Sequence, residues 1–193
     1  MLTIHGLENH NHMIGTFVDH PQAKIEIHFV GKHASLTIGR NVRCHQVKFF
    51  LAEGAVVVIG DDCELSGQIR CTNFCQISVG DRTRILGKSR IHAHERVAIE
   101  IGKDCLIEGL HCRTSDSHKI FDGAGQRLNT GQPIGIEDGV YIAAGVHLYK
   151  GVHVGAGSAI LAGSQVFKSI PAQSAACGSP AQVYAHPIAW QSA

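Results

Sequence analysis

Pairs of aliphatic residues written apolar-x-apolar recur along this chain and constrain its fold more than any other feature. The six pairs are Leu36/Ile38, Val57/Ile59, Ile77/Val79, Ile99/Ile101, Ile134/Ile136 and Val152/Val154. Their second members are 21, 20, 22, 35 and 18 residues apart, so the spacing stays near eighteen apart from small insertions and one large one. From Ile136 to Val166 an aliphatic residue returns at every sixth position. Neither an α-helix nor a hairpin strand has this period.

A period of six predicts a chain that bends after each short strand, so that three strands complete one triangular coil and stacked coils share a core. One side of the coils gives the column Cys44, Leu65, Ile85, Ile107, Ile142 and Ile160. The next side gives Phe50, Cys71, Ile91, Leu148 and Val166. A glycine followed by polar residues comes after most pairs, as in Gly39-Arg40-Asn41, and such residues tolerate the backbone angles of sharp bends. The sequence therefore predicts an all-β solenoid.

With these columns the chain resembles the hexapeptide-repeat family, over about residues 24–185. The resemblance implies a left-handed parallel β-helix and, for most members, acyl transfer from acetyl-coenzyme A. We expect a single domain over residues 1–193, with an irregular capping coil at 1–35 and a C-terminal extension at 172–193. The resemblance also implies a homotrimer with active sites between neighbouring subunits, and Val56 and Val58 are candidates for its interface.

Charge and composition disfavour several classes of partner. The formal net charge is +1 and the lysines and arginines are scattered along the sequence, so we expect no binding to nucleic acid or to an anionic membrane. No apolar run approaches the ~20 residues of a membrane helix, and no signal sequence opens the chain, which predicts a cytoplasmic protein. The seven cysteines lack paired CxxC motifs and are expected to be reduced core residues.

The repeat is interrupted between Ile101 and Ile136, where 17 residues exceed one coil. We expect the polar segment 111–132 to form the active-site loop, because function concentrates on long loops held by a rigid scaffold. Within it, Ser115-Asp116-Ser117-His118 resembles the Asp-x-His segment of the family's sugar and polysaccharide O-acetyltransferases. That resemblance implies His118 as the catalytic base, with Asp116 contacting the substrate. An imidazole titrates close enough to neutrality to accept a hydroxyl proton and return it to a thiolate.

Two later segments resemble the same family near its reacting centre and along its coenzyme A stretch. They are residues 139–145, and residues 155–171 with 178–183. In the first segment Val140-Tyr141-Ile142-Ala143 stands where the family commonly has Val-Trp-Ile-Gly, so that tyrosine replaces tryptophan. The resemblance implies that Tyr141 is a catalytic residue near the reacting centre, where its hydroxyl can donate a hydrogen bond; simple packing at a coil corner is the alternative. We expect backbone amides around Ala143 and Ala144 to stabilise the oxyanion. The residues expected to contact coenzyme A are Ala143, Ala144, Ala162, Gly163, Phe167 and Lys168. Small residues admit the pantetheine arm and a lysine suits a phosphate, although Phe167 stands where the family usually has threonine.

His92 and His94 form an Ile-His-Ala-His-Glu segment one coil before the loop, and alternate residues of a strand point to the same side. We expect these two histidines to contact the acceptor; a solvated structural role and metal ligation are the alternatives. Carbonic anhydrases built on the same helix hold zinc with two ligands five residues apart in a late coil. That spacing occurs here only at His5/His10 and His28/His33, both in early coils. No metal is expected.

The sequence therefore predicts an acetyl-CoA-dependent O-acetyltransferase that acts on a sugar hydroxyl of a capsular or other surface polysaccharide by direct transfer. Three alternatives stay open. They are an N-acetyltransferase acting on an amino sugar, a carbonic-anhydrase-like zinc protein, and a catalytically inactive scaffold on the same fold.

Overall fold

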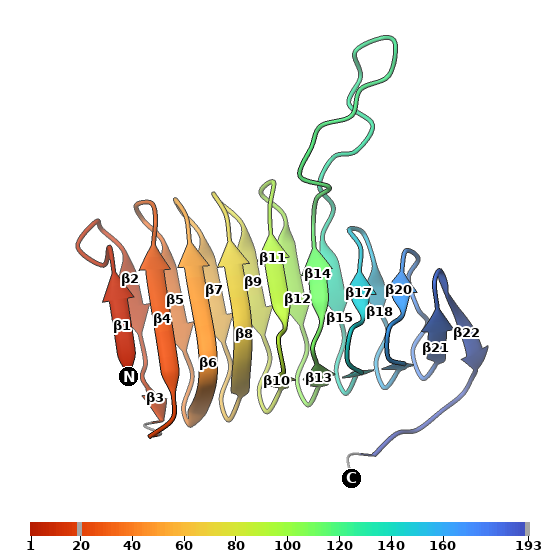
Figure 1. Ribbon diagram of the computed structural model, residues 1–193, viewed down its shortest axis with the longest axis horizontal. Coiled ribbons are helices and arrows are strands. Elements are labelled where there is room, and N and C mark those ends of the chain that lie inside the picture. The colour runs from red at the N-terminus through yellow and green to blue at the C-terminus, as the bar shows by residue number, and fades with distance from the viewer. Residues whose placement is uncertain (19–20, 192–193) are drawn as a thin grey trace.

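The computed structural model describes residues 1–18 and 21–191, and it is a three-sided parallel β-helix (Figure 1). Its first face holds β2 (His12–Ile14), β5 (Ser35–Ile38), β7 (Val56–Ile59), β9 (Gln76–Val79), β12 (Ala98–Ile101), β15 (Ile134–Ile136) and β18 (His153–Val154). Its second face holds β3 (Phe17–Val18), β10 (Arg84–Leu86), β13 (Leu106–Glu108), β16 (Tyr141–Ile142), β19 (Ala159–Ile160) and β21 (Ala175–Gly178).

The third face holds β1 (Leu2–His5), β4 (Lys24–Phe29), β11 (Arg90–Ala93), β14 (His111–Arg113), β17 (His147–Leu148) and β20 (Gln165–Val166). Two longer strands, β6 (Val42–Leu51) and β8 (Glu64–Cys71), contribute their first halves to the second face and their second halves to the third. We call the edge between the second and third faces the glycine edge, and the edge between the third and first faces the loop edge.

The six aliphatic pairs all point into one continuous core, and every member is at most 4% exposed. Because successive strand residues face opposite sides, each pair places two side chains inside and one residue outside, as in the first-face strand β7. Residues at the same coil position pair in register along the whole first face, for example Val57 with Ile77 and Ile99 with Ile134. The predicted solenoid is therefore confirmed.

The strand register confirms one predicted core column and corrects the other. Cys44, Leu65, Ile85, Ile107, Ile142 and Ile160 pair successively along the second face. On the third face the column is Ile27, Phe49, Ile69, Ile91, Cys112, Leu148 and Val166. The prediction that Phe50 and Cys71 occupy this column is wrong. An irregularity in β6 between Cys44 and Val47 shifts the register there, and Ile69, not Cys71, pairs with Ile91. Cys71 is buried, but it pairs with Leu51 and Ala93. Phe50 instead faces outward and stacks on His28.

The seven cysteines are all free, six of them buried and Cys177 partly exposed. Burial raises the pKa of the Cys44, Cys71 and Cys112 thiols to about 12, so these groups stay protonated at neutral pH. They pack as small apolar residues, as the sequence predicts.

Both ends of the helix continue its ladders. The strands of the N-terminal coil, β1, β2 and β3, pair in parallel with β4, β5 and β6. At the other end β21 pairs with β19, and β22 (Ala181–Ala185) folds back antiparallel to β21. Residues 19–20 and 192–193, which belong to the two predicted end segments, lie outside the described residues. In the part of the chain that is described, no helix has the length and apolar character needed to span a membrane.

Candidate active site

A loop of residues 114–133 leaves the loop edge after β14, extends away from the coils and returns to β15 (Figure 1). It begins three residues later than the sequence predicts, because His111–Arg113 form β14 and remain in the third-face ladder. At its base the hydroxyl of Thr114 accepts a hydrogen bond from the His94 amide at 2.8 Å and donates one to the His94 carbonyl at 2.9 Å. The loop is thereby attached to the preceding coil.

Asn129 organises the loop from within. Its side chain is 7% exposed, and its Nδ2 donates to the His118 carbonyl at 2.6 Å and to Asp116 Oδ2 at 3.1 Å. Its Oδ1 accepts a hydrogen bond from the Ile120 amide at 2.7 Å. One buried amide therefore joins the backbone of His118 and Ile120 and the side chain of Asp116 to the returning half of the loop.

Two ion pairs fasten the loop to neighbouring coils. Lys150 pairs with Asp116 Oδ2, and this hydrogen bond, followed by that from Asn129, lowers the pKa of Asp116. Arg127 pairs with Glu95 at 2.6 Å, which lowers the pKa of Glu95, and the other Glu95 oxygen accepts the Gly131 amide at 3.0 Å. The sequence pattern does not identify Lys150, Arg127 and Glu95 as anchors, because the bonded residues are 32 to 36 positions apart and only the fold brings them together.

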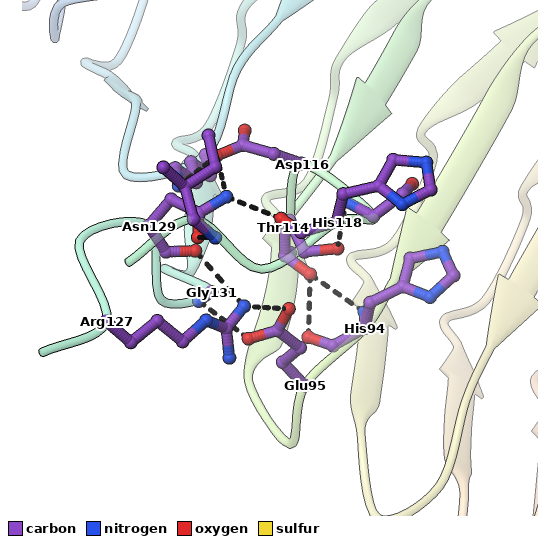
Figure 2. Close-up of polar contacts among 12 residues, drawn as sticks. His94, Glu95, Thr114, Asp116, His118, Arg127, Asn129 and Gly131 are labelled. Atoms are coloured by element: carbon purple, nitrogen blue, oxygen red, sulfur yellow. Dashed lines mark hydrogen bonds and ion pairs between the residues drawn. The ribbon is translucent and has the colours of Figure 1, made fainter. Parts of the chain in front are cut away.

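His118 presents an exposed imidazole from this fixed backbone. Figure 2 shows its ring projecting to the same side as the ring of His94, away from the Arg127–Glu95 pair. Asp116, which the sequence assigns to substrate, faces Lys150 and Asn129, although it also lines a groove beside the loop. The loop therefore holds an exposed imidazole ring on a fixed backbone, beside His94.

The groove beside the loop has a volume of about 380 Å³ and lies on the third face, between β14, β17 and the loop base. Its lining residues are His111, Arg113, Ser115, Asp116, His147, Leu148 and Tyr149. The His92 ring, on β11, lies 6.1 Å from that of His94 and 6.3 Å from that of His111, and its Nε2 is 3.0 Å from Gln68 Oε1. Two of the expected acceptor residues thus lie together next to this groove.

These histidines are held neutral. Burial is the main cause that lowers the pKa of His92 to about 4, and the nearby Arg70 charge adds to it. Burial likewise lowers the pKa of His94 and of His111. At neutral pH they offer one ring donor and one ring acceptor each, which suits hydrogen bonding to sugar hydroxyls.

The glycine edge brings together four of the six residues expected to bind coenzyme A. Ala144, Ala162 and Gly163 are exposed and Ala143 is buried, and the Gly163 amide donates to the Ala144 carbonyl at 3.0 Å. Gly163 has a φ of +71°, and a Cβ built on it meets open space. The edge is therefore a low ridge of backbone on which an extended chain can lie.

One detail of the expected oxyanion site is wrong. The Ala143 amide already donates to the Ile160 carbonyl at 3.0 Å within the second-face ladder, so this N–H is not available to a reaction centre. Of the two amides expected to stabilise the oxyanion, the one that stays a prediction is that of Ala144.

Phe167 and Lys168 lie at the loop edge, at the opposite end of β20 from Gly163. The Phe167 ring is 50% exposed and stacks on Tyr149, with ring centroids 4.1 Å apart and an interplanar angle of 16°. Lys168 is exposed beside it. The six expected donor residues are thus divided between two edges of the helix.

Tyr141 lies on the second face, beyond the glycine edge from the loop. Its hydroxyl donates to Glu108 Oε2 at 2.9 Å, and this hydrogen bond raises the pKa of Tyr141. The Trp190 ring packs against it at 5.4 Å, and the Trp190 indole N–H donates to the Gly139 carbonyl at 2.7 Å. Trp190 was not predicted from the sequence, because it follows the last strand and carries no repeat signal. Within one chain, Tyr141 is not brought to His118.

No group of three or more histidine, cysteine or acidic side chains in residues 1–18 and 21–191 is arranged to hold a metal ion.

Comparison with known proteins gives one consistent result. No family model matches the chain. It is 37% identical to the polysialic acid O-acetyltransferase of Escherichia coli O1:K1 / APEC over 136 residues, which cover 69% of this chain and 44% of that protein. It is 29% identical to the polysialic acid O-acetyltransferase of Neisseria meningitidis over 117 residues, which cover 58% of this chain and 54% of that protein. The chain spans about half the length of the curated relatives it matches.

Solved structures show the same similarity over the whole chain. The polySia specific acetyltransferase NeuO superposes with a TM-score of 0.90 at 29% identity, covering 100% of this chain and 89% of that one. The polysialic acid O-acetyltransferase OatWY superposes with a TM-score of 0.88 at 24% identity, covering 100% and 92%. These matches confirm the predicted left-handed β-helix.

Proposed function

The chain belongs to the hexapeptide-repeat acyltransferase family, and we propose that it is an acetyl-CoA-dependent O-acetyltransferase acting on a sugar hydroxyl of a surface polysaccharide. The observation that carries the proposal is the anchored loop, which presents His118 beside His94 and next to the third-face groove (Figure 2). The names of the relatives make polysialic acid the first acceptor to test.

In this proposal His118 is the general base. The acceptor hydroxyl oxygen bonds to the acetyl carbon while the carbon–sulfur bond of the thioester breaks. The proton passes from the hydroxyl to His118 and then to the departing sulfur, so no acyl-enzyme is needed. A single well-placed base contributes about 10²- to 10⁴-fold in rate. Asn129 and Lys150 act on the reaction indirectly, by holding the loop that carries the ring.

The glycine edge fits the donor. Acetyl-CoA supplies the activated acetyl group, and its pantetheine arm would lie along Ala144, Ala162 and Gly163. These exposed residues are small, and a larger side chain at any of them would occupy the space of the arm. The Ala144 amide is the proposed donor to the developing oxyanion. Tyr141 remains the proposed aromatic on the far side of this edge, backed by Trp190.

This arrangement requires a second subunit. The loop carrying His118 starts at one edge of the third face, and the proposed donor site lies at the other. Gly145 and Lys150 are five positions apart, which in extended chain corresponds to about 16 Å. We propose a homotrimer in which the loop of one subunit reaches the glycine edge of its neighbour, so that base and donor meet between copies.

The test uses the purified protein, acetyl-CoA and polysialic acid, with mass spectrometry of the glycan. We expect a gain of acetyl mass that mild base removes, since an ester is labile and the amide of an N-acetyl product is not. His118→Ala should lower turnover at least 10²-fold with donor binding unchanged. His12→Ala, an exposed histidine on the first face, is the matched control. Normal turnover by His118→Ala would refute the assignment.

A further inference from the structure

We propose that the third face on the N-terminal side of the loop is a binding track for an extended acidic polysaccharide, which it guides along the helix axis into the groove next to His118. The inference rests on the proposed function and adds to it a second binding region with a defined chemistry. It concerns residues that lie outside the reacting centre.

Basic side chains gather on this part of the third face and on the adjoining glycine edge. They are Lys24, Lys48, Arg70, Lys88, Arg90 and Arg113. The strand segments of the same region carry a single carboxylate, Glu26, which pairs with Lys24 at 3.3 Å and Lys48 at 2.7 Å. These cations are scattered in sequence, and the coil spacing of about twenty residues brings them onto one face.

Of the eleven other lysines and arginines, six pair with a carboxylate in the described part of the chain. Arg40 pairs with Asp61, Arg82 with Asp104 and Arg84 with Glu64, at 2.5 to 2.8 Å. By contrast Arg70, Lys88, Arg90 and Arg113 have no carboxylate within 4.0 Å among residues 1–18 and 21–191. Unpaired cations in a row attract a polyanion, and no internal acid competes for them.

The surface is hollowed where these cations lie. A groove of about 530 Å³ runs across β4, β6 and β8 and along the glycine edge, from Lys24 to Lys88 and Arg90. The second groove, beside the loop, begins at His111. Arg90 and His111 are register partners on adjacent strands, so the two grooves meet at this pair and form one track.

Register also sets the spacing of the charges. Arg70, His92 and Arg113 are successive partners on β8, β11 and β14, so the two arginines are two strand spacings apart, or about 9.6 Å. The guanidinium of Arg70 is held over the Phe50 ring, 4.8 Å from its centroid, and Phe50 stacks in turn on His28. Such fixed guanidinium groups bind carboxylates in a defined geometry, with neutral His92 between them to bond sugar hydroxyls.

The test compares wild type with the triple variant Arg70→Gln/Lys88→Gln/Arg90→Gln. Calorimetry measures direct binding of long polysialic acid chains. Turnover is measured with the long chains and with a disaccharide of the same sugar. We expect a roughly tenfold weaker Kd and a similar rise in KM for long chains, which corresponds to about 1.4 kcal/mol. Turnover of the disaccharide should stay unchanged. Added salt should weaken binding by the wild type more than by the triple variant.

The control is Lys32→Gln/Lys103→Gln, which removes two exposed cations from other edges and should change nothing. Equal long-chain binding by the triple variant and the wild type would overturn the track. Equally tight wild-type binding of single-stranded DNA would also overturn it, because the face would then be a general polyanion site. Absence of acetyl transfer by the wild type would refute the proposed function alone, since direct binding tests the track without turnover.

Discussion

Asn129 offers the sharpest test of how the loop positions His118. Its carboxamide makes three hydrogen bonds, to the His118 carbonyl, to Asp116 and from the Ile120 amide. Each is worth about 1 kcal/mol net, so Asn129→Ala should weaken the held loop by about 3 kcal/mol. If these 3 kcal/mol all act to depopulate the loop conformation that supports catalysis, kcat/KM falls about 10²-fold.

Two further measurements separate positioning from general damage. The thermal midpoint should stay within a few degrees of wild type, because the buried core lies in the coils and not in the loop. Hydrogen exchange of the amides in residues 116–131 should become faster.

Gln126→Ala is the control for this experiment, since Gln126 is an exposed residue of the same loop whose described hydrogen bonds use its backbone. It should retain wild-type kcat/KM. Full activity in Asn129→Ala would show that the loop does not need this amide to hold His118, and would refute the reasoning.

Two other predictions concern the donor ridge and the histidine cluster. Gly163→Val should lower the free energy of unfolding by about 1–2 kcal/mol because φ at this residue is +71°, and it should also raise KM for acetyl-CoA. Gly157→Val, at another edge with φ of +66°, is the control. In thermal melts it should show the same loss of stability, but its KM for acetyl-CoA should not change. The lowered pKa of His92 means that the unfolded chain takes up a proton before the folded one, so the free energy of unfolding should fall between about pH 6.5 and pH 4. Denaturant titrations should show a smaller fall in His92→Gln.

The solenoid was predictable because its signal is repeated. Each coil places aliphatic residues at equivalent positions, so the first-face ladder could be written from spacing alone. The error at Phe50 shows the limit of this reasoning. A local irregularity in β6 shifts the third-face register, and Phe49 and Phe50 are equally apolar in sequence, so only strand pairing identifies the buried one.

The candidate site was predictable in part. The break in the repeat located the loop, and its boundary moved by three residues because a strand precedes the excursion. The anchors Asn129, Lys150 and Glu95 were not predictable, since each acts through a contact to a residue in another coil or across the loop. The row of unpaired cations on the third face was hidden for a similar reason, because a net charge of +1 says nothing about which cations have partners.

The central claim is that base and donor ridge come from different subunits, and mixed trimers test it most directly. His118→Ala lacks the base. Ala162→Trp places a large ring on the exposed ridge at the glycine edge and should block the donor. Each variant alone should be inactive while remaining folded. In trimers co-expressed from equal amounts of both, each interface receives an intact base and an intact ridge with a probability of about one half each, so activity should return to about one quarter of wild type. Mixed trimers that stay inactive would contradict a site shared between subunits.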